Sequence, residues 1–190
     1  MEINKDWSIL KVDDFINVER FIEDPPDWEG GNIRYYNSGS WTKEEPESCI
    51  IKGKTYARYK YPLFKPLVSK IKFFLQDCLD EELIETYWFD RFYFPGSSML
   101  PHTDRAACEI SVSLNINNTT NSEYPLWIKL DDEAQKIITN PGDAVVYQGT
   151  KNKHWRDQLV GVGKTYYHQV FFHFVKANGY HVEQAWDAIS

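Results

Sequence analysis

The sequence has few cysteines, and those present are not arranged in pairs. Cys49, Cys78 and Cys108 are odd in number and widely spaced, and no Cys-x-x-Cys occurs. This pattern argues against a disulfide framework and against a zinc knuckle. Reduced, buried thiols are the simpler interpretation, and they favour a reducing, cytoplasmic setting.

Long apolar runs and an excess of positive charge are also missing. No apolar run approaches the roughly 18 residues of a membrane-spanning helix, and the first residues lack the apolar stretch of a signal peptide. The formal net charge is −7, whereas a general nucleic-acid binder would show a basic face. We therefore expect neither a membrane span nor general nucleic-acid binding.

What the chain does have is a high share of aromatic side chains, 16% of its residues. This content favours a β-rich body and a cavity with aromatic walls, although core packing accounts for most such residues. A chain of 190 residues is most simply one domain with a substantial core. We expect an N-terminal strand, helices and loops in residues 1–84, the core in 85–178 and a tail in 179–190.

The N-terminal part is predicted to hold a short strand at 8–12 and two helices. The first helix follows a pair of aspartates that can cap it, and it ends before Pro25. The second begins near Pro62 and carries an apolar stripe at helical spacing as far as Leu79, so it should pack against a sheet. Residues 27–58 are rich in glycine, serine and charge, which predicts long loops with short strands.

From Thr86 onward the pattern changes to strands separated by regular turns. Residues 109–117 alternate strictly between apolar and polar side chains, as in a strand with one apolar face. Helices followed by many short strands predict a β-rich α+β fold, a jelly-roll or cupin-like barrel with N-terminal buttressing helices. The other strands are expected at residues 87–94, 126–130, 136–138, 143–148 and 165–175.

Two histidines and one aspartate stand where such a barrel could bring them together. His102 and Asp104 are two residues apart, so both can point to one side of an extended strand. His154, fifty-two residues after His102, follows another strand-like run and can supply a third ligand. Two histidines and a carboxylate that leave coordination positions open are typical of non-haem Fe(II) oxygenases. The His-x-Asp pair alone is a weak signal, and the order of the surrounding elements strengthens it.

The ordered set of motifs resembles a known family. Tyr93-Phe-Pro-Gly96, His102-Thr-Asp104, Pro141-Gly-Asp143 and His154 follow one another as in the 2-oxoglutarate- and Fe(II)-dependent oxygenases. The nearest branch is the prolyl 4-hydroxylase-like group, including its small microbial and phage members, and the likeness covers roughly residues 85–178. The resemblance implies a double-stranded β-helix in which His102, Asp104 and His154 bind iron.

By the same resemblance, the chain would hydroxylate a C–H bond of a prolyl residue, a peptide or a small molecule. It would use dioxygen and 2-oxoglutarate and release succinate and CO2, with ascorbate as one candidate reductant. Lys164, ten residues after His154, matches the residue that holds the far carboxylate of 2-oxoglutarate, and Tyr93 matches a tyrosine that binds the same cosubstrate. Arg156 is a rival of Lys164, because its planar fork suits a carboxylate. Weaker candidates for this anchor are Arg91 and Arg105.

The remaining histidines are expected to serve the core or the surface. His168 and His173 are five residues apart in a strand, so at most one of them faces inward, and a hydrogen-bonded core role suits either. His181 is expected at the surface. Asp143 is expected to form a turn instead of adding a second carboxylate to the site.

Two other functions stay open on the sequence, as does the oligomeric state. The same three ligands could hold Zn²⁺ on a cupin-like barrel for non-oxidative chemistry. A metal-free jelly roll could instead bind a sugar or a peptide by stacking it on aromatic rings. The tryptophans available for such stacking are Trp41, Trp88, Trp127 and Trp155.

Overall fold

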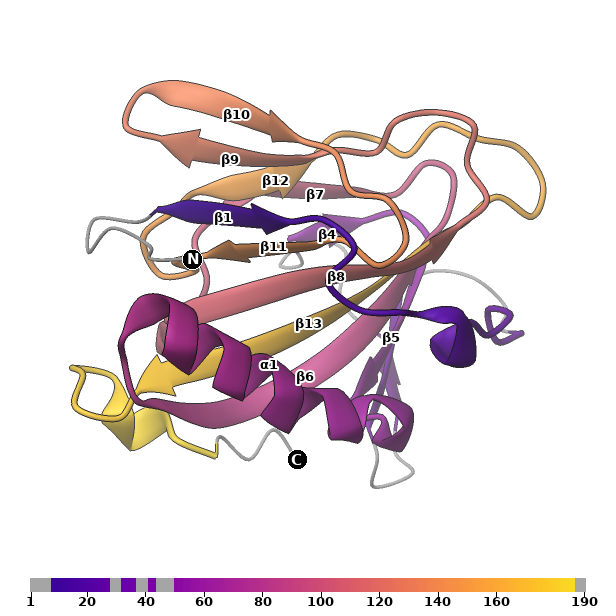
Figure 1. Ribbon diagram of the computed structural model, residues 1–190. Helices are drawn as coiled ribbons and strands as arrows, with labels where there is room; N and C mark the ends of the chain where they lie inside the picture. Colours follow the sequence, from indigo (N-terminus) through magenta and orange to yellow (C-terminus); the bar gives the residue numbers. More distant parts are fainter. Residues whose placement is uncertain (1–7, 28–31, 37–40, 44–49, 187–190) are drawn as a thin grey trace.

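The computed structural model describes residues 8–27, 32–36, 41–43 and 50–186, whose strands form two sheets lying one over the other (Figure 1). In spatial order, the larger sheet contains β1 (Ile9–Val12), β11 (Ala144–Tyr147), β8 (Ile110–Asn118), β13 (Tyr167–Lys176), β6 (Leu83–Tyr93), β5 (Thr55–Tyr59), β2 (Asn32–Tyr36) and β3 (Trp41–Lys43). The smaller sheet contains β10 (Glu133–Ile137), β9 (Leu126–Leu130), β12 (His154–Arg156), β7 (Ser98–His102) and β4 (Ile51–Lys52).

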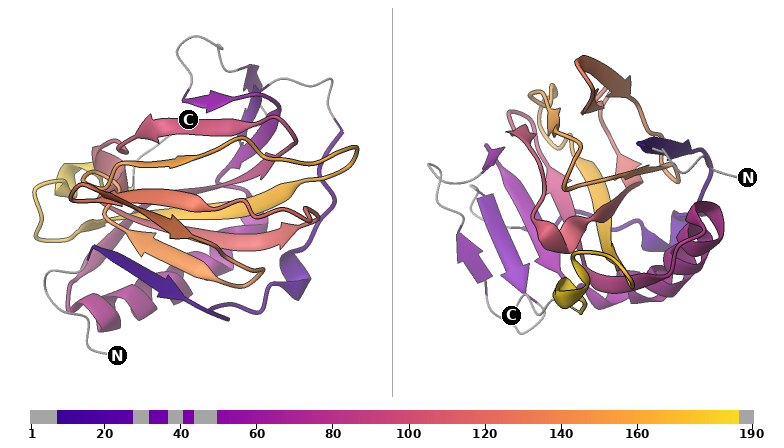
Figure 2. Two further views of the ribbon diagram at one scale, coloured as in Figure 1. Left: turned by 90° about the horizontal axis from the view of Figure 1, so that it is seen from above. Right: turned by 90° about the vertical axis from the view of Figure 1, so that its left-hand side faces the viewer.

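Neighbouring strands in both sheets come from distant parts of the chain. β8 lies between β11 and β13, and β12 lies between β9 and β7. Among the described strands the pairing is antiparallel, except between β2 and β5, which run parallel. Figure 2 shows the smaller sheet from above and the two sheets from the side. This arrangement confirms the predicted β-rich jelly-roll body.

One long helix covers the outer face of the larger sheet. α1 (Lys65–Leu79) follows a 3₁₀ turn at Pro62–Phe64 and ends at Asp80, which adopts a left-handed conformation with φ 51°. Its apolar stripe, which includes Leu67, Ile71 and Leu75, packs on the sheet and forms the main core. The predicted buttressing helix is therefore confirmed. Burial of this stripe is what stabilises the helix in water.

The two faces of β8 differ in chemistry because successive residues of a strand point to opposite sides. Ile110, Val112, Leu114 and Ile116 belong to the main core under α1. Ser111, Ser113 and Asn115 point the other way, toward the smaller sheet, and they are buried as well. The predicted alternation is thus correct, but the polar face does not meet solvent. It contributes to the interior of the barrel.

The structure corrects the predicted first helix. Only Glu19–Phe21 is helical, as a single 3₁₀ turn. The preceding residues instead bond to the turn before β11: the Asp14 N–H donates to the Asp143 carboxylate at 3.0 Å, and the Ile16 N–H donates to the Gly142 carbonyl at 3.2 Å. These contacts, together with the left-handed conformation of Asp14 (φ 49°), hold the segment against the turn before β11 and not in a helix.

Two further differences concern the edges of the predicted core. An additional strand, β7, ends at His102, and β1, β4 and β5 from the N-terminal part pair with core strands. Asp143 forms its turn as predicted, because its carboxylate accepts the Asn140 N–H at 2.8 Å. Short 3₁₀ turns also occur at Ala106–Cys108 and Val182–Gln184.

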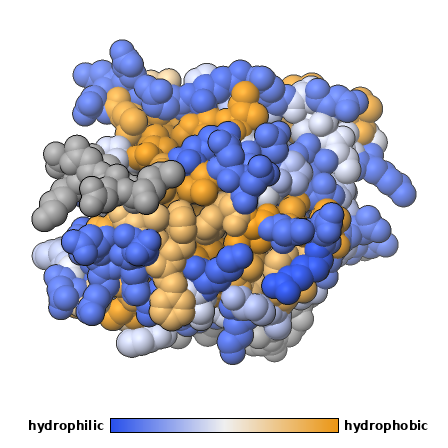
Figure 3. All heavy atoms as spheres, in the orientation of Figure 1, coloured by the Kyte–Doolittle hydropathy of each residue, from blue (hydrophilic) through white to orange (hydrophobic). Residues whose placement is uncertain are grey.

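The surface shown in Figure 3 mixes polar and apolar side chains. Apolar side chains gather over the middle of this face, and polar ones surround them. Within the described ranges, no helix combines the length and the apolar character needed to cross a membrane.

Candidate metal centre

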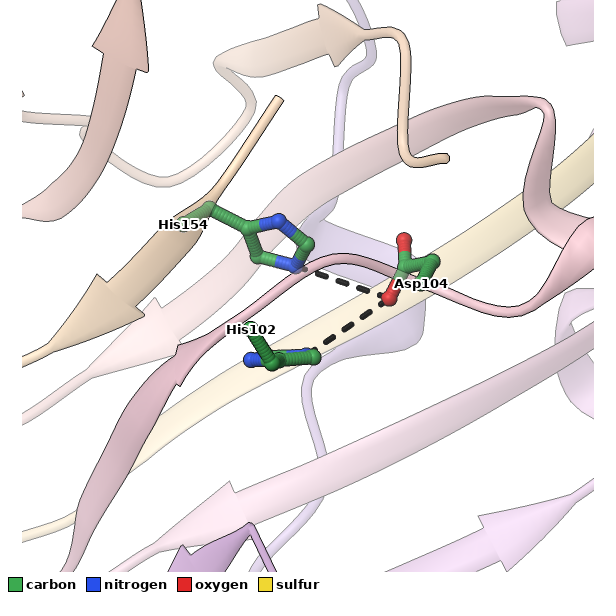
Figure 4. Close-up of side chains that lie close together, drawn as sticks. All are labelled: His102, Asp104 and His154. Atoms are coloured by element: carbon green, nitrogen blue, oxygen red, sulfur yellow. Dashed lines mark ion pairs between the residues drawn. The ribbon is translucent and has the colours of Figure 1, made fainter. Parts of the chain in front are cut away.

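The two predicted histidine ligands are brought together by strand pairing. His102 is the last residue of β7, His154 is the first residue of β12, and the two residues lie opposite each other in the antiparallel register. Their ring centroids are 4.3 Å apart. Figure 4 shows both rings beside Asp104. A pair of residues fifty-two positions apart is therefore held by the ladder of the smaller sheet.

Asp104 completes the group from the chain just after β7. Its backbone N–H donates to the Gly149 carbonyl at 2.8 Å, which fixes the position of the residue. Its Oδ1 lies 3.6 Å from Nε2 of His102 and 3.5 Å from Nε2 of His154 (Figure 4). An ion about 2.1 Å from each of two ligands can join atoms up to roughly 4.2 Å apart. Asp104 Oδ1 can thus share an ion with either histidine.

Backbone carbonyls decide which ring nitrogen of each histidine faces Asp104. His102 Nδ1 donates to the Leu100 carbonyl at 2.8 Å, and His154 Nδ1 donates to the Asn152 carbonyl at 2.9 Å. A carbonyl only accepts, so both protons sit on Nδ1 and a neutral ring presents a lone pair at Nε2. Two such lone pairs and a carboxylate oxygen converge on one point. A carboxylate oxygen that faces two such lone pairs needs a proton or a cation between them, and the arrangement fits a divalent metal ion.

The charge of Asp104 suits the same purpose. Burial raises the pKa of its carboxyl group, but the interactions with His102 and His154 outweigh burial and hold the pKa well below its ordinary value. The group is therefore ionised at neutral pH, as a metal ligand must be.

A cavity of about 580 Å³ opens beside these three residues. Its walls come from both sheets, and six of the 17 lining residues are tyrosine or phenylalanine. Tyr59, Phe89 and Tyr87 form a nearly parallel stack, with the Tyr59 and Phe89 ring centroids 4.9 Å apart. The volume is in the usual range for small-ligand sites. The other lining residues are Ile50, Ile51, Arg91, Tyr93, Met99, His102, Thr103, Asp104, Arg105, Cys108, Tyr147, His154, Phe171 and His173.

Sequence reasoning missed several residues around Asp104. Ser111 donates to Asp104 Oδ2 at 3.0 Å and lies 3.0 Å from His173 Nδ1. A Cβ atom at Gly149 would collide with the Cys108 carbonyl and with Asp104 Oδ2, so only glycine fits there. His173 had been predicted only as a hydrogen-bonded core residue, and burial lowers its pKa to about 4. The alternation of residues 109–117 predicts that Ser111 lies on the polar face of its strand, but it does not predict the contacts with Asp104 and His173.

The three predicted contacts of the cosubstrate lie in different surroundings. Tyr93 is buried and lines the cavity. Lys164 is exposed, in the turn before β13, and it does not line the cavity. Arg156 is buried outside the cavity lining, where its guanidinium donates to the Tyr124 carbonyl at 2.5 Å and to Gln169 Oε1 at 2.7 Å. The weaker candidate Arg91 is buried and does line the cavity.

The other histidines behave largely as expected. His168 faces away from the cavity and meets Asp90, 2.8 Å from its Nε2, in a buried group that also includes Arg58. Burial lowers the pKa of His168, against the opposing effect of Asp90. His173 faces the cavity, which confirms that only one of the pair looks inward. His181 is partly exposed.

Three of the four tryptophans considered for a stacking platform have structural partners. Trp127 and Trp155 form a cross-strand pair whose rings are stacked on each other at 6.1 Å, and Trp127 donates to Asp157 at 2.8 Å. Trp88 packs against the main core and donates to the Tyr61 carbonyl. The side chain of Trp41 lies outside the described residues. These contacts stabilise the sheet without invoking a ligand.

No protein-family model and no curated protein matches the sequence. Solved structures match it in fold. A Pseudomonas putida prolyl-4-hydroxylase is 14% identical, with a TM-score of 0.59, and the match covers 88% of this chain and 91% of that one. The viral collagen prolyl hydroxylase of Paramecium bursaria Chlorella virus-1, in its 2-oxoglutarate complex, is 8% identical with a TM-score of 0.58, covering 89% and 96%.

A third match is a Trichoplax adhaerens prolyl hydroxylase in complex with a peptide fragment of the hypoxia-inducible-factor oxygen degradation domain. It is 12% identical with a TM-score of 0.59, and the match covers 88% of this chain and 83% of that one. The fold is that of the 2-oxoglutarate-Fe(II) oxygenases. The predicted double-stranded β-helix is therefore confirmed. At these identities the likeness establishes the oxygenase fold, and the activity has to be argued from the site.

Proposed function

We propose that this protein is a 2-oxoglutarate- and Fe(II)-dependent dioxygenase that hydroxylates a C–H bond. The observation that carries the proposal is the convergence of His102, Asp104 and His154 beside a cavity, in a fold shared with such oxygenases. Both imidazoles present lone pairs, and the carboxylate is ionised. This is the donor set that suits Fe(II) in oxygenases.

The protein's own groups would hold the metal and leave room for its other ligands. His102, Asp104 and His154 fill three positions, so positions remain for a cosubstrate. Iron bound there would supply the oxidising chemistry, with 2-oxoglutarate converted to succinate and CO2. The carbonyls of Leu100 and Asn152 keep both imidazoles in the tautomer that a metal requires.

For the far carboxylate of 2-oxoglutarate, we propose Arg91 together with Tyr93 in place of Lys164. Both side chains point from β6 into the cavity, where a guanidinium screened from water binds a carboxylate strongly. Thr55 Oγ1, 2.7 Å from Arg91 Nη1, orients the guanidinium. Lys164 is exposed outside the cavity lining, and Nη1 and Nη2 of Arg156 already donate to Tyr124 and Gln169.

For the substrate, we propose a prolyl residue of a peptide, with a small apolar molecule as the alternative. The stacked rings of Tyr59, Phe89 and Tyr87 give a largely apolar wall that suits a compact apolar ring. The similarity in fold to prolyl hydroxylases, one of them bound to a peptide, supports this choice. The cysteine pattern supports a reducing, cytoplasmic setting, which would keep iron ferrous.

An anaerobic titration tests the proposed activity. Metal-free protein is titrated with Fe(II) and 2-oxoglutarate, and we expect a visible metal-to-ligand charge-transfer band. Admission of air should then produce succinate, faster in the presence of a suitable prolyl peptide.

The outcome that contradicts the proposal is equally clear. Protein that forms no such band and produces no succinate in air is not an oxygenase of this class. Retention of Zn²⁺ with hydrolytic activity that survives in air would point to the non-oxidative metal site instead.

A further inference from the structure

We propose that His173 is a positioning residue of the metal centre and that it acts on Asp104 through Ser111. This inference rests on the proposed metal site, although it does not depend on which reaction the metal performs. The three residues come from different segments: Asp104 follows β7, Ser111 lies on β8 and His173 lies on β13. Ser111 and His173 are direct neighbours in the register of the larger sheet.

The single proton of Ser111 determines the direction of the hydrogen bonds. Ser111 Oγ lies 3.0 Å from Asp104 Oδ2, 3.0 Å from His173 Nδ1 and 3.3 Å from the Cys108 carbonyl. The carboxylate and the carbonyl can only accept, so the hydroxyl proton goes to one of them. The ionised carboxylate, at the shorter distance, is the stronger acceptor. His173 must therefore donate its Nδ1 proton to Ser111.

This assignment fits the rest of the His173 ring. The ring packs against Tyr87 and Phe89, with centroids 4.7 Å and 5.7 Å away, which restricts its rotation. Its Nε2 is buried and has no hydrogen-bond partner within the described part of the chain. A proton at Nε2 would therefore be buried without an acceptor, and the Nδ1 tautomer avoids that cost. Protonation of the ring would also leave the Nδ1 proton in place, so the chain of donors holds in either state.

The consequence for Asp104 is that its two oxygens have separate partners. Oδ2 receives the Ser111 proton, and Oδ1 remains directed at Nε2 of His102 and of His154. The absence of a side chain at Gly149 leaves Oδ2 just enough space. The chain from His173 to Ser111 to Asp104 thus holds the carboxylate so that one oxygen faces the metal. Such outer partners of metal ligands change metal affinity by about 10–100-fold.

A rival role for His173 is direct binding of a metal. Asp104, Cys108 and His173 each offer a ligand atom within 4.8 Å of the others. In that case a thiolate would contact the ion. The two roles differ in a spectroscopic signature, because Co²⁺ bound to a thiolate shows a strong ultraviolet charge-transfer band that a site of two histidines and a carboxylate lacks.

The test measures Co²⁺ affinity and absorption in metal-free protein. Ser111→Ala and His173→Phe should each weaken Co²⁺ binding about 10–100-fold and alter the visible d–d bands. His173→Asn should restore affinity to within about threefold of the wild type, because its amide can place a donor near the Nδ1 position. The double variant Ser111→Ala/His173→Phe should be little worse than either single variant, since both break one chain.

Ser113→Ala is the matched control. Ser113 lies two residues further on the same face of β8, is equally buried, and has no hydrogen-bond partner for its hydroxyl among the described residues. Ser113→Ala should leave Co²⁺ binding unchanged. This control separates the loss of the hydrogen bonds between His173, Ser111 and Asp104 from the loss of a buried hydroxyl. Thermal unfolding of each variant checks that the protein is folded.

Three results would overturn the inference. The first is a wild-type Co²⁺ affinity in His173→Phe. The second is a Co²⁺ affinity in His173→Asn that is no higher than in His173→Phe. The third is an ultraviolet thiolate band that Cys108→Ala abolishes. If wild-type protein binds Co²⁺ through these residues but forms no succinate with Fe(II), the oxygenase proposal fails and the positioning role stands. If the oxygenase is active and the variants bind Co²⁺ normally, the positioning role alone fails.

Discussion

Along β8, Val112 and Leu114 face α1, whereas Ser111 and Ser113 face the smaller sheet. The same contrast continues on β13, where Phe172 packs under α1 and His173 lines the cavity. Both faces are buried, so the difference between them is chemical and not one of exposure. The outer face stabilises the fold by apolar packing, and the inner face carries hydrogen-bonding groups around the candidate metal centre. Substitutions on the outer face should therefore change mainly the stability of the protein, and substitutions on the inner face mainly its metal binding.

The largest expected effect is on the inner side. Asp104→Ala removes the ionised ligand, so binding of Fe(II) or Co²⁺ should be abolished. The free energy of unfolding of the metal-free protein should also fall, because the interactions that hold the pKa of Asp104 low stabilise the folded protein. Metal titration and urea unfolding measure the two effects. Asp132→Ala, at a fully exposed carboxylate, is the control and should change neither.

On the outer face, a substitution should lower the free energy of unfolding and leave metal binding nearly unchanged. Phe172→Ala removes a fully buried ring from the main core, which should cost about 3–5 kcal/mol of unfolding free energy. The protein that remains folded should bind Co²⁺ with nearly wild-type affinity. A variant that keeps its stability but loses metal binding would show that the two faces are not separable.

The pH dependence of stability sharpens the comparison next. Burial lowers the pKa of His173 to about 4, against 6.5 for an ordinary histidine. The unfolded chain thus takes up this proton at a higher pH than the folded one, so stability is complete above pH 6.5 and declines as the pH falls toward 4. The decline from this one group should be roughly 3 kcal/mol. Metal-free His173→Asn should lack this decline in stability. The lowered pKa of His168 affects the wild type and the variant alike.

Urea unfolding of the two metal-free proteins between pH 7 and pH 4 makes this measurement. The stability curves should converge or cross as the pH falls, because only the wild type loses the contribution of His173. Parallel curves over the whole range would show that His173 titrates normally in the folded protein.

The smallest expected effect concerns the cosubstrate. Arg91→Ala should raise the 2-oxoglutarate concentration needed for half-maximal formation of the charge-transfer band by about 10–100-fold, the usual range for a hydrogen bond between charged groups. Lys164→Ala should leave it unchanged, and Arg156→Ala should act mainly through stability. A rise in Lys164→Ala without one in Arg91→Ala would restore the original assignment of Lys164.

The parts of the site that were predicted correctly depend on short-range patterns. His102 and Asp104 share a side because they are two residues apart, and α1 followed from its apolar stripe. The pairing of His154 opposite His102 needed the order of motifs in the family resemblance, since nothing near either residue specifies a register. Local periodicity thus predicts the direction of a side chain, but it does not predict the residues that the side chain contacts in another strand.

The errors come from contacts between distant segments. The segment after Asp14 is not helical because contacts with Gly142 and Asp143 hold it against the turn before β11. The assignment of Lys164 as the cosubstrate anchor stays a prediction, and Lys164 lies in an exposed turn before β13 begins at Tyr167. The pairing of Ser111 with His173 depends on the register between β8 and β13, which the sequence of either strand leaves open.

The position of the metal ligands also has a consequence for the unfolding of the chain. An ion held by both His102 and His154 would close a loop of about fifty residues, much as a disulfide does, in a protein whose described cysteines form none. Binding to the folded state alone adds stability that grows with the logarithm of the free metal concentration. The stability of the smaller sheet, in which β12 has only three residues, would then vary with the concentration of the bound ion.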